Sequence, residues 1–426
     1  MFDWYRESNA KERKTFWTCY SGWALDSYDV QIFSFMLPVL MGVWQLSKAD
    51  AGYIGTAALI SAAFGGWIAG VLSDRFGRVR ILVVTVIWFT LFGALAGFAQ
   101  NYEQLLLARM IQGIGFGGEW AVGAALMAEV INPKHRGKAI GFVQSGFSLG
   151  WLMAAVVAVS IQGMTSPEMS WRITFWISVL PAGIILFFRR GLEDSNAYKR
   201  AAQSGQEKAS ILTVFKPRYL RMTTLASLMV LGIQAAAYSI IVWTPTMLVE
   251  RGIEKGSLIM TITIMAVGTF IGFVVTSYLT DAWGRRPTLV LMSLISLGAT
   301  MAYTLLPLDN GMTQLFGTIS LGGSIGLFAA VGPLLSELFP TEVRGTCMGF
   351  CYNLGKTVGA MCISVVGILA ATMTLGPAIA LCAGVAYGLT LISLMLLPET
   401  RGRDLENVAM DSNADALSSS MAKAKA

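Results

Sequence analysis

Long apolar segments recur along the whole chain and are separated by short polar segments. An α-helix rises 1.5 Å per residue, so about 20 apolar residues suffice to cross the roughly 30 Å hydrocarbon core of a bilayer. Twelve segments meet this requirement, and each predicts a membrane-spanning helix. They lie at residues 16–41, 53–72, 81–100, 104–130, 138–162, 171–188, 222–248, 257–279, 288–307, 312–336, 346–370 and 376–397.

The longest polar segment between two spans divides the predicted helices into two groups of six. It covers residues 189–221 and follows the sixth span. We therefore expect an all-α membrane protein with an N-terminal segment at 1–15, six-helix bundles at 16–188 and 222–397, and a polar tail at 398–426. The Ser-rich and Ala/Lys-rich end of the tail has a composition typical of disorder.

The composition favours a surface that faces lipid. Of the 426 residues, 55% are hydrophobic and 13% are charged, and the mean hydropathy is +0.61, whereas a soluble domain carries roughly 25% charged residues. The net charge of +6 could indicate nucleic acid, but the basic residues lie in short loops and form no soluble basic module. The five cysteines lie in or beside apolar segments and have no metal-ligand spacing. We expect neither a nucleic-acid partner, nor a metal, nor a cofactor.

The distribution of Lys and Arg predicts the orientation. Two of the 31, Arg109 and Lys356, lie inside predicted spans. Four others lie in the odd-numbered loops, namely Lys48, Arg172, Arg251 and Lys255. The remaining Lys and Arg residues lie in the N-terminal segment, the even-numbered loops and the C-terminal tail. Because basic loops stay in the cytoplasm, both termini are predicted to be cytoplasmic. No cleavable signal with a small-residue cleavage site follows the N-terminus, and the expected location is a bacterial inner membrane.

Two loop motifs occur twice. The sequence Gly-Val-Leu-Ser-Asp-Arg-Phe-Gly-Arg at 70–78 recurs in altered form at 277–286, and residues 129–142 recur at 337–350. The offsets are 207 and 208 residues, and this agreement indicates two homologous halves. Such repeats are typical of carriers that bind their substrate near the middle of the membrane.

The repeated motifs resemble those of the major facilitator superfamily, and the resemblance covers essentially the whole chain. The sequence Pro-Glu-Thr-Arg-Gly at 398–402 resembles the ending of the sugar porters. Segments 23–29 and 109–119 are most similar to proton-coupled organic-acid carriers, a branch that includes uptake proteins for sialic acid, aromatic acids and dicarboxylates. Span five lacks the Gly-Pro-rich motif of drug-exporting antiporters, which favours uptake by symport.

Four ionisable residues inside spans are candidates for proton coupling, because a charge within a bilayer is costly. Asp26 and Asp29 lie about 15–20 Å into span one, on one helical face. Two carboxylates in a dehydrated cavity repel, so one is expected to bind a proton reversibly. The resemblance implies an ion pair between Asp29 and Arg109, and the alternative is that Asp29 only stabilises the bundle through this pair. Glu119 in span four either carries a proton or pairs with a base on another helix.

Lys356 lies roughly in the middle of span eleven and is a candidate for anion binding. The alternative is that it only neutralises a carboxylate such as Glu119 or Asp26. Polar and aromatic groups in the neighbouring spans suit a carboxylated or hydroxylated solute of modest size, although an aromatic residue within a span more often packs. The candidate substrate-binding residues besides Lys356 are Gln144, Gln234, Tyr238, Trp243, Tyr352 and Asn353.

The repeated loop motifs are predicted to form a cytoplasmic gate. Ion pairs and helix-end charges there could latch one state and release when the halves move; the alternative is topology signalling with ordinary surface pairing. The gate candidates are Gly70, Asp74, Arg75, Gly77, Arg78, Glu129, Arg136, Asp281, Gly284, Arg285, Arg286, Glu337 and Arg344.

These features predict a monomeric secondary transporter that takes up a small organic anion together with protons by alternating access. The first alternative is a porter of a neutral, sugar-like solute. The second is a membrane sensor, which the short central loop and tail disfavour because they are too small for an output domain. An enzyme is not expected, because the sequence has no Ser/His/Asp set, metal cluster or nucleotide-binding loop.

Overall fold

The computed structural model describes residues 3–131, 136–180, 183, 214–253, 255–339 and 343–401, apart from some side chains within the helices. The described residues form helices joined by short turns and contain no strand. The helices are α1 (Asp3–Glu7), α2 (Ala10–Trp44), α3 (Lys48–Phe76), α4 (Arg78–Ala96), α5 (Tyr102–Val130), α6 (Arg136–Gln144), α7 (Gly146–Met164), α8 (Pro167–Ile177), α11 (Pro217–Glu250), α12 (Lys255–Trp283), α13 (Arg285–Leu305), α14 (Asn310–Gly326), α15 (Phe328–Leu338), α16 (Arg344–Leu369) and α17 (Leu375–Leu396).

Each predicted span falls on one of these helices or on a consecutive pair. The fifth span is divided into α6 and α7 at Ser145, and the tenth into α14 and α15 at Leu327; neither division was predicted from the sequence. The sixth span begins with α8, and its later part lies outside the described residues. The polar tail from residue 402 and most of the predicted central loop also lie outside them.

Polar caps extend several helices beyond their apolar segments. The side chain of Asn9 accepts a hydrogen bond from the backbone N–H of Glu12, and the Glu12 carboxylate accepts one from Asn9. This reciprocal capping box satisfies backbone donors at the helix start, so α2 begins six residues before the predicted span. Ser47 and Asp50 cap α3 in the same way.

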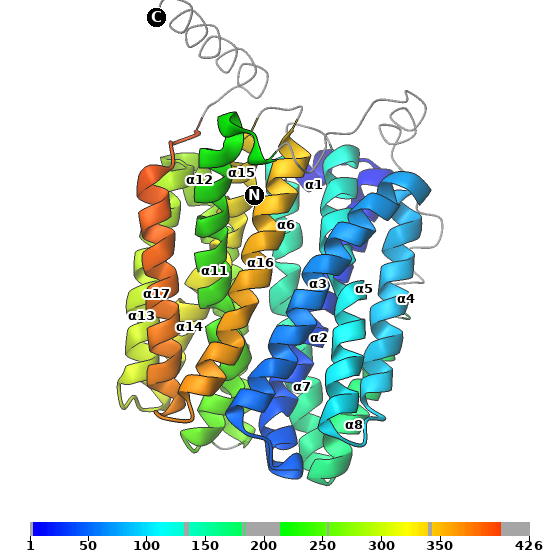
Figure 1. Ribbon diagram of the computed structural model, residues 1–426, viewed down its shortest axis with the longest axis vertical. Coiled ribbons are helices and arrows are strands. Elements are labelled where there is room, and N and C mark those ends of the chain that lie inside the picture. The colour runs from blue at the N-terminus through cyan, green and yellow to red at the C-terminus, as the bar shows by residue number, and fades with distance from the viewer. Residues whose placement is uncertain are drawn as a thin grey trace, which may run out of the picture.

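The helices form two groups that lie side by side with their axes roughly along the long axis of the molecule (Figure 1). We call α2–α8 the first half and α11–α17 the second half. Helix α2 packs against α11, α3 packs against α16, and α6 and α7 pack against α12. We call the end at which α2 begins and α17 ends the terminal end, and the other end the opposite end.

Close helix packing repeats in the two halves at the offsets seen in the sequence. A Cβ atom added at Gly65 would lie 1.9 Å from the carbonyl oxygen of Ile114, where α3 meets α5. A Cβ atom added at Gly272 would lie 2.0 Å from the carbonyl oxygen of Gly322, where α12 meets α14. These contacts are again related by 207 and 208 residues. Small residues that let backbones approach are typical of helix packing in membranes, so the halves share one packing scheme.

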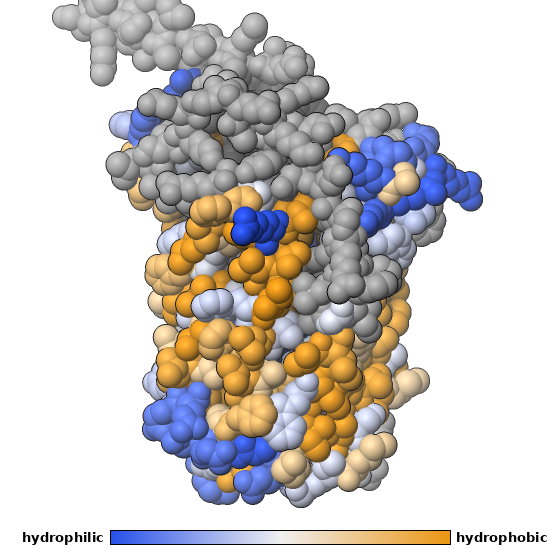
Figure 2. All heavy atoms as spheres, turned by 90° about the vertical axis from the view of Figure 1, so that its right-hand side faces the viewer, coloured by the Kyte–Doolittle hydropathy of each residue, from blue (hydrophilic) through white to orange (hydrophobic). Residues whose placement is uncertain are grey.

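The surface and the helix lengths agree with a protein that spans a membrane several times. Nine described segments of 18 residues or more are long and apolar enough to cross a bilayer. Helices α2 and α5 are 35 and 29 residues long but are not among the nine; both carry buried polar side chains. On the face shown in Figure 2, hydrophobic residues cover the middle, and hydrophilic residues gather toward the ends.

Candidate functional site

A buried ion pair joins α2 and α5 in the first half. Nη1 of Arg109 lies 3.3 Å from Oδ2 of Asp29, and the two side chains are only 5% and 7% exposed. The pair that the sequence resemblance implied is therefore present. The guanidinium also lies over the ring of Phe33, 4.8 Å from its centroid. A carboxylate this deeply buried is held in place by its partners, because an isolated charge would be costly.

Gln112 completes this cluster and was not among the residues predicted from the sequence. Its Oε1 accepts a hydrogen bond from Nη1 of Arg109 at 2.6 Å, and its Nε2 donates to Oδ1 of Asp29 at 2.7 Å. Gln112 follows Arg109 by three residues, so the two lie on one face of α5. This spacing was the signal in the sequence that could have identified Gln112.

A small cavity of about 20 Å³ adjoins the cluster of Asp29, Arg109 and Gln112. Most of its lining comes from the first half, and Val242 of α11 and Ile363 of α16 add apolar surface from the second half. Asp29 and Arg109 are the charged side chains in this lining. The cavity is large enough for about one water molecule.

Lys356 of α16 lies where the second half meets the first. Its ammonium nitrogen lies 4.6 Å from the ring centroid of Phe116 of α5, and the side chain is 8% exposed. Asp26 of α2 is near enough to act on Lys356 electrostatically. No described carboxylate lies within ion-pair distance of the ammonium group, so the cation–π contact with the ring stabilises it directly.

Gln234 and Tyr238 of α11 form a chain of hydrogen bonds toward α16. The hydroxyl of Tyr238 donates to Oε1 of Gln234 at 2.8 Å, and Nε2 of Gln234 donates to the carbonyl oxygen of Tyr352 at 3.1 Å. These three predicted site residues therefore lie together. Asn353 donates to the carbonyl oxygen of Gly349 within its own helix.

Two other predicted substrate-binding residues have different surroundings. The indole N–H of Trp243 donates to the carbonyl oxygen of Ile363 at 3.1 Å, and the ring is fully buried between α11 and α16. In this structure Trp243 packs the second half together. Gln144 ends α6, and its Oε1 is buried without a hydrogen-bond donor among the described residues. Gln144 therefore has capacity to accept a hydrogen bond from a solute.

Hydrogen bonds and an ion pair join the two halves on the opposite-end side of the centre. The hydroxyl of Thr56 in α3 donates to the carbonyl oxygen of Ala360 at 2.9 Å and lies 2.7 Å from the hydroxyl of Ser364 in α16. Nearer that end, Nζ of Lys48 forms an ion pair of 2.7 Å with Glu250. These bonds join α3 to α16 and α11 and hold the halves together on this side.

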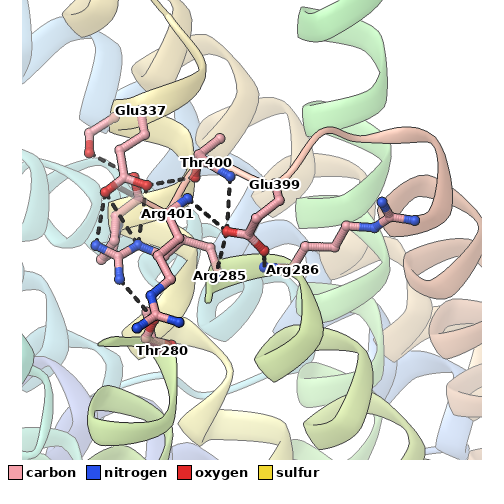
Figure 3. A network of polar contacts seen from close by, with 9 residues as sticks. Thr280, Arg285, Arg286, Glu337, Glu399, Thr400 and Arg401 are labelled. Atoms are coloured by element: carbon pink, nitrogen blue, oxygen red, sulfur yellow. Dashed lines mark hydrogen bonds and ion pairs between the residues drawn. The ribbon is translucent and has the colours of Figure 1, made fainter. Parts of the chain in front are cut away.

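At the terminal end, a polar network holds three parts of the second half together (Figure 3). The guanidinium of Arg285 at the start of α13 pairs with Glu337 of α15 at 2.9 Å. Thr400, beyond α17, donates from its hydroxyl to the same Glu337 carboxylate at 2.6 Å. Arg285 and Glu337 belong to the second half and Thr400 follows its last helix, so these bonds brace that half.

Glu399 completes the network and was not predicted as a site residue. Its carboxylate accepts hydrogen bonds from the backbone N–H groups of Arg285 and Arg286, each at 3.0 Å, and thereby caps α13. Burial raises the pKa of Glu399. Hydrogen bonds from backbone N–H groups, including those of Arg401 and Thr400, together lower it by more than burial raises it, so the pKa lies below its ordinary value. Gly284 has φ of +112°, and a Cβ there would lie 2.9 Å from the carboxylate, so only glycine fits.

The remaining predicted residues have little or no described environment. The backbone of Gly77 joins α3 to α4 with a φ of +102°. The side chains of Glu119 and of most gate candidates lie outside the described residues; these candidates are Asp74, Arg75, Arg78, Glu129, Arg136, Asp281 and Arg344, and the surroundings of Gly70 are likewise not described.

Two helical halves with buried charges where they meet define a membrane transporter. The chain matches the Major Facilitator Superfamily over residues 20–363 and belongs to this family. The predicted family and fold are thus confirmed, and the protein is a multi-pass transporter of small organic solutes, not an enzyme.

Comparisons with individual proteins agree with this assignment. The chain is 54% identical over 408 residues to a protein of Cupriavidus pinatubonensis named "Probable 4-methylmuconolactone transporter", covering 96% of this chain and 95% of that one. It is 27% identical to the cis,cis-muconate transport protein of Acinetobacter baylyi, covering 83% and 86% of the two chains. The crystal structure of a D-xylose-proton symporter has a TM-score of 0.75 at 19% identity, covers 92% of this chain and 99% of its own, and shows the shared fold.

Proposed function

We propose that this protein is a proton-coupled symporter that takes up a small organic anion by alternating access. The observation that carries the proposal is the position of Lys356. A buried cation at the meeting of two halves, with no described carboxylate at ion-pair distance, is suited to bind the carboxylate of a solute.

The named relatives support a particular class of anion. 4-Methylmuconolactone is a lactone ring with one carboxylate, and cis,cis-muconate is a six-carbon diene with two; both names belong to relatives of this chain. Each solute combines a carboxylate with a short, flat, unsaturated skeleton. Lys356 would bind the carboxylate, and Phe116 and Tyr238 offer aromatic surface for the skeleton. We therefore propose a muconolactone-like or muconate-like acid as the substrate.

The buried ion pair in the first half supports proton coupling. Asp29 is the described carboxylate that lines the cavity beside Arg109. In the proposed cycle, a proton binds one of the buried carboxylates (Asp29, Asp26 or Glu119) from outside, the anion binds at Lys356, and the halves move so that the site opens inward. Loss of the proton in the cytoplasm then releases the anion.

The proposed orientation follows from the basic residues of the loops. The terminal end, with both termini, would face the cytoplasm of a bacterial cell, and the chain would act as a monomer in its inner membrane. The bundles would be residues 16–188 and 222–397, and the motifs at the terminal end would form the gate. Because Arg285 and Glu337 lie in one half, the latch between halves would need partners from the first half.

The test is uptake by purified protein in liposomes. With an inward proton gradient, 4-methylmuconolactone or cis,cis-muconate should accumulate, and a protonophore should abolish the accumulation. Competition separates this proposal from the porter of a neutral solute: free acids should compete, whereas their amides should not. Uptake that persists unchanged without the gradient would overturn the coupling, and equal competition by amides would overturn the anion class.

A further inference from the structure

Three hydrogen-bonding side chains form a closed ring within the first half. Nη1 of Arg109 donates both to Oδ2 of Asp29, at 3.3 Å, and to Oε1 of Gln112, at 2.6 Å. Nε2 of Gln112 donates to Oδ1 of Asp29 at 2.7 Å. A guanidinium can only donate and an ionised carboxylate can only accept, so the orientation of the amide is fixed by its two partners.

The distances show which contact is the stronger one. The guanidinium lies 2.6 Å from the amide oxygen and 3.3 Å from the carboxylate oxygen, so it is 0.7 Å closer to the amide. The amide N–H occupies Oδ1 of Asp29, so Oδ2 is the oxygen with the longer contact. A proton that arrives at Asp29 would therefore bind Oδ2, and the guanidinium would lose its acceptor there.

Packing keeps Gln112 in this position. A Cβ atom added at Gly93 of α4 would lie 2.6 Å from Nε2 of Gln112 and 3.5 Å from Oδ1 of Asp29. The α4 backbone thus covers the amide, and the side chain of Gln112 is only 2% exposed. The other cavity-lining residues from α3, α11 and α16 are Gly55, Ala58, Leu59, Val242 and Ile363, none of which carries a charge.

When Asp29 is protonated, Gln112 can supply the hydrogen-bond acceptor that Arg109 loses. Neutralising the carboxylate leaves a buried guanidinium without its counter-charge, and a buried donor that lacks an acceptor is destabilising. We infer that Gln112 is a positioning residue for proton coupling: its amide oxygen holds Arg109 when Asp29 is protonated, and its amide N–H keeps Oδ1 of Asp29 occupied so that the proton binds Oδ2. The proton enters from one side of the membrane and leaves to the other, and no other bond is made or broken.

This inference rests on the proposed symport, and it predicts different effects of a Gln112 substitution on exchange and on accumulation of the solute. Exchange of labelled 4-methylmuconolactone across liposomes at equal pH needs no net proton movement, whereas accumulation under an inward proton gradient does. Gln112→Met keeps the volume and removes both hydrogen-bonding groups. We expect it to lower accumulation about tenfold or more and exchange by less than about threefold.

A second variant restores one of the hydrogen-bonding groups of Gln112. Gln112→Glu supplies an acceptor for Arg109 and should accumulate several times more solute than Gln112→Met. Gln314→Met is the matched control, because Gln314 donates to Thr261 in the second half, away from the charges; it should accumulate solute as the unaltered protein does.

The outcomes separate the inference from the proposed function. Equal loss of exchange and accumulation in Gln112→Met, without recovery in Gln112→Glu, would assign Gln112 a purely structural role. Unchanged accumulation in Gln112→Met would also overturn the inference. If the unaltered protein exchanges the solute but does not respond to a proton gradient, the proposed coupling itself fails.

Discussion

The ammonium group of Lys356 lies 4.6 Å from the ring centroid of Phe116, so a cation of the second half contacts an aromatic ring of the first. A cation over a ring is stabilised by about 1–2 kcal/mol when it is desolvated, less than a carboxylate partner can offer. A bound organic anion would therefore compete well with the ring for Lys356. This contact makes the cation available to a solute at the place where the halves meet.

Replacing Lys356 should weaken binding of a carboxylated solute. Lys356→Met removes a charge-assisted bond worth about 2 kcal/mol, which corresponds to roughly 30-fold in affinity. Substrate-induced thermal stabilisation, titrated with 4-methylmuconolactone, measures the change. Lys356→Arg keeps the charge and should retain part of the affinity, and Lys11→Met, on the exposed surface, is the control. Unchanged affinity in Lys356→Met would show that the anion binds elsewhere.

A cross-link between Thr56 and Ser364 should block transport. Their hydroxyl oxygens lie 2.7 Å apart across the two halves, and a disulfide between cysteines at these positions would hold α3 against α16. The oxidised double variant Thr56→Cys, Ser364→Cys should lose at least roughly nine-tenths of its uptake, and a reducing agent should restore it. Both single variants should remain active under oxidising conditions. Full uptake by protein whose cross-link is verified by mass spectrometry would exclude movement at this contact.

Gly117 should be one of the positions least tolerant of substitution. A Cβ atom there would lie 1.5 Å from the carbonyl oxygen of Ala62, so Gly117→Ala must push α5 away from α3. We expect a loss of about 3 kcal/mol or more in the free energy of unfolding. Gly298→Ala meets nothing within 4 Å and should be neutral or slightly stabilising. The two variants can be compared by thermal unfolding in detergent, and similar melting temperatures would contradict the packing described here.

Glu399 should stabilise the terminal end in a pH-dependent manner. Because its folded pKa lies below the ordinary value of 4.5, the stabilisation is complete well above pH 4.5 and is lost as the pH falls through the lowered pKa. Glu399→Gln should cost about 0.5–1 kcal/mol at pH 7, since solvent screens this partly exposed group. The difference from the unaltered protein should shrink below about pH 4. Glu168→Gln, at an exposed position in α8, is the control, and a pH-independent difference would contradict the role of the charge.

Hydrophobic patterning predicted the helices well because burial in lipid needs long apolar segments whatever their neighbours. Each predicted span falls on a described helix or a consecutive pair, apart from the later part of the sixth span, which lies outside the described residues. The boundaries were less accurate where polar caps extend the helix, as at Asn9 and Glu12, since capping residues look like loop residues. The division of the fifth span at Ser145 has no signal in the hydropathy.

The candidate site was predicted only in part. The pair of Asp29 and Arg109 came from the resemblance, because no pattern within one helix shows which residue of another helix it contacts. Phe116 reads as an ordinary apolar residue of α5 until Lys356 is seen beside it. Glu399 lies beyond the last span, and its role depends on the folded position of the α13 start. Contacts between distant segments are what the sequence alone could not supply.

Accumulation of 4-methylmuconolactone by the Asp29→Asn variant tests proton coupling through Asp29 most directly. Asparagine has nearly the shape of aspartate, but its amide does not take up and release a proton. The substitution also removes the counter-charge of Arg109. We predict that the unaltered protein concentrates the solute in liposomes under an inward proton gradient, whereas the variant exchanges it but only equilibrates it. Gradient-driven accumulation by Asp29→Asn at the level of the unaltered protein would contradict proton coupling through Asp29.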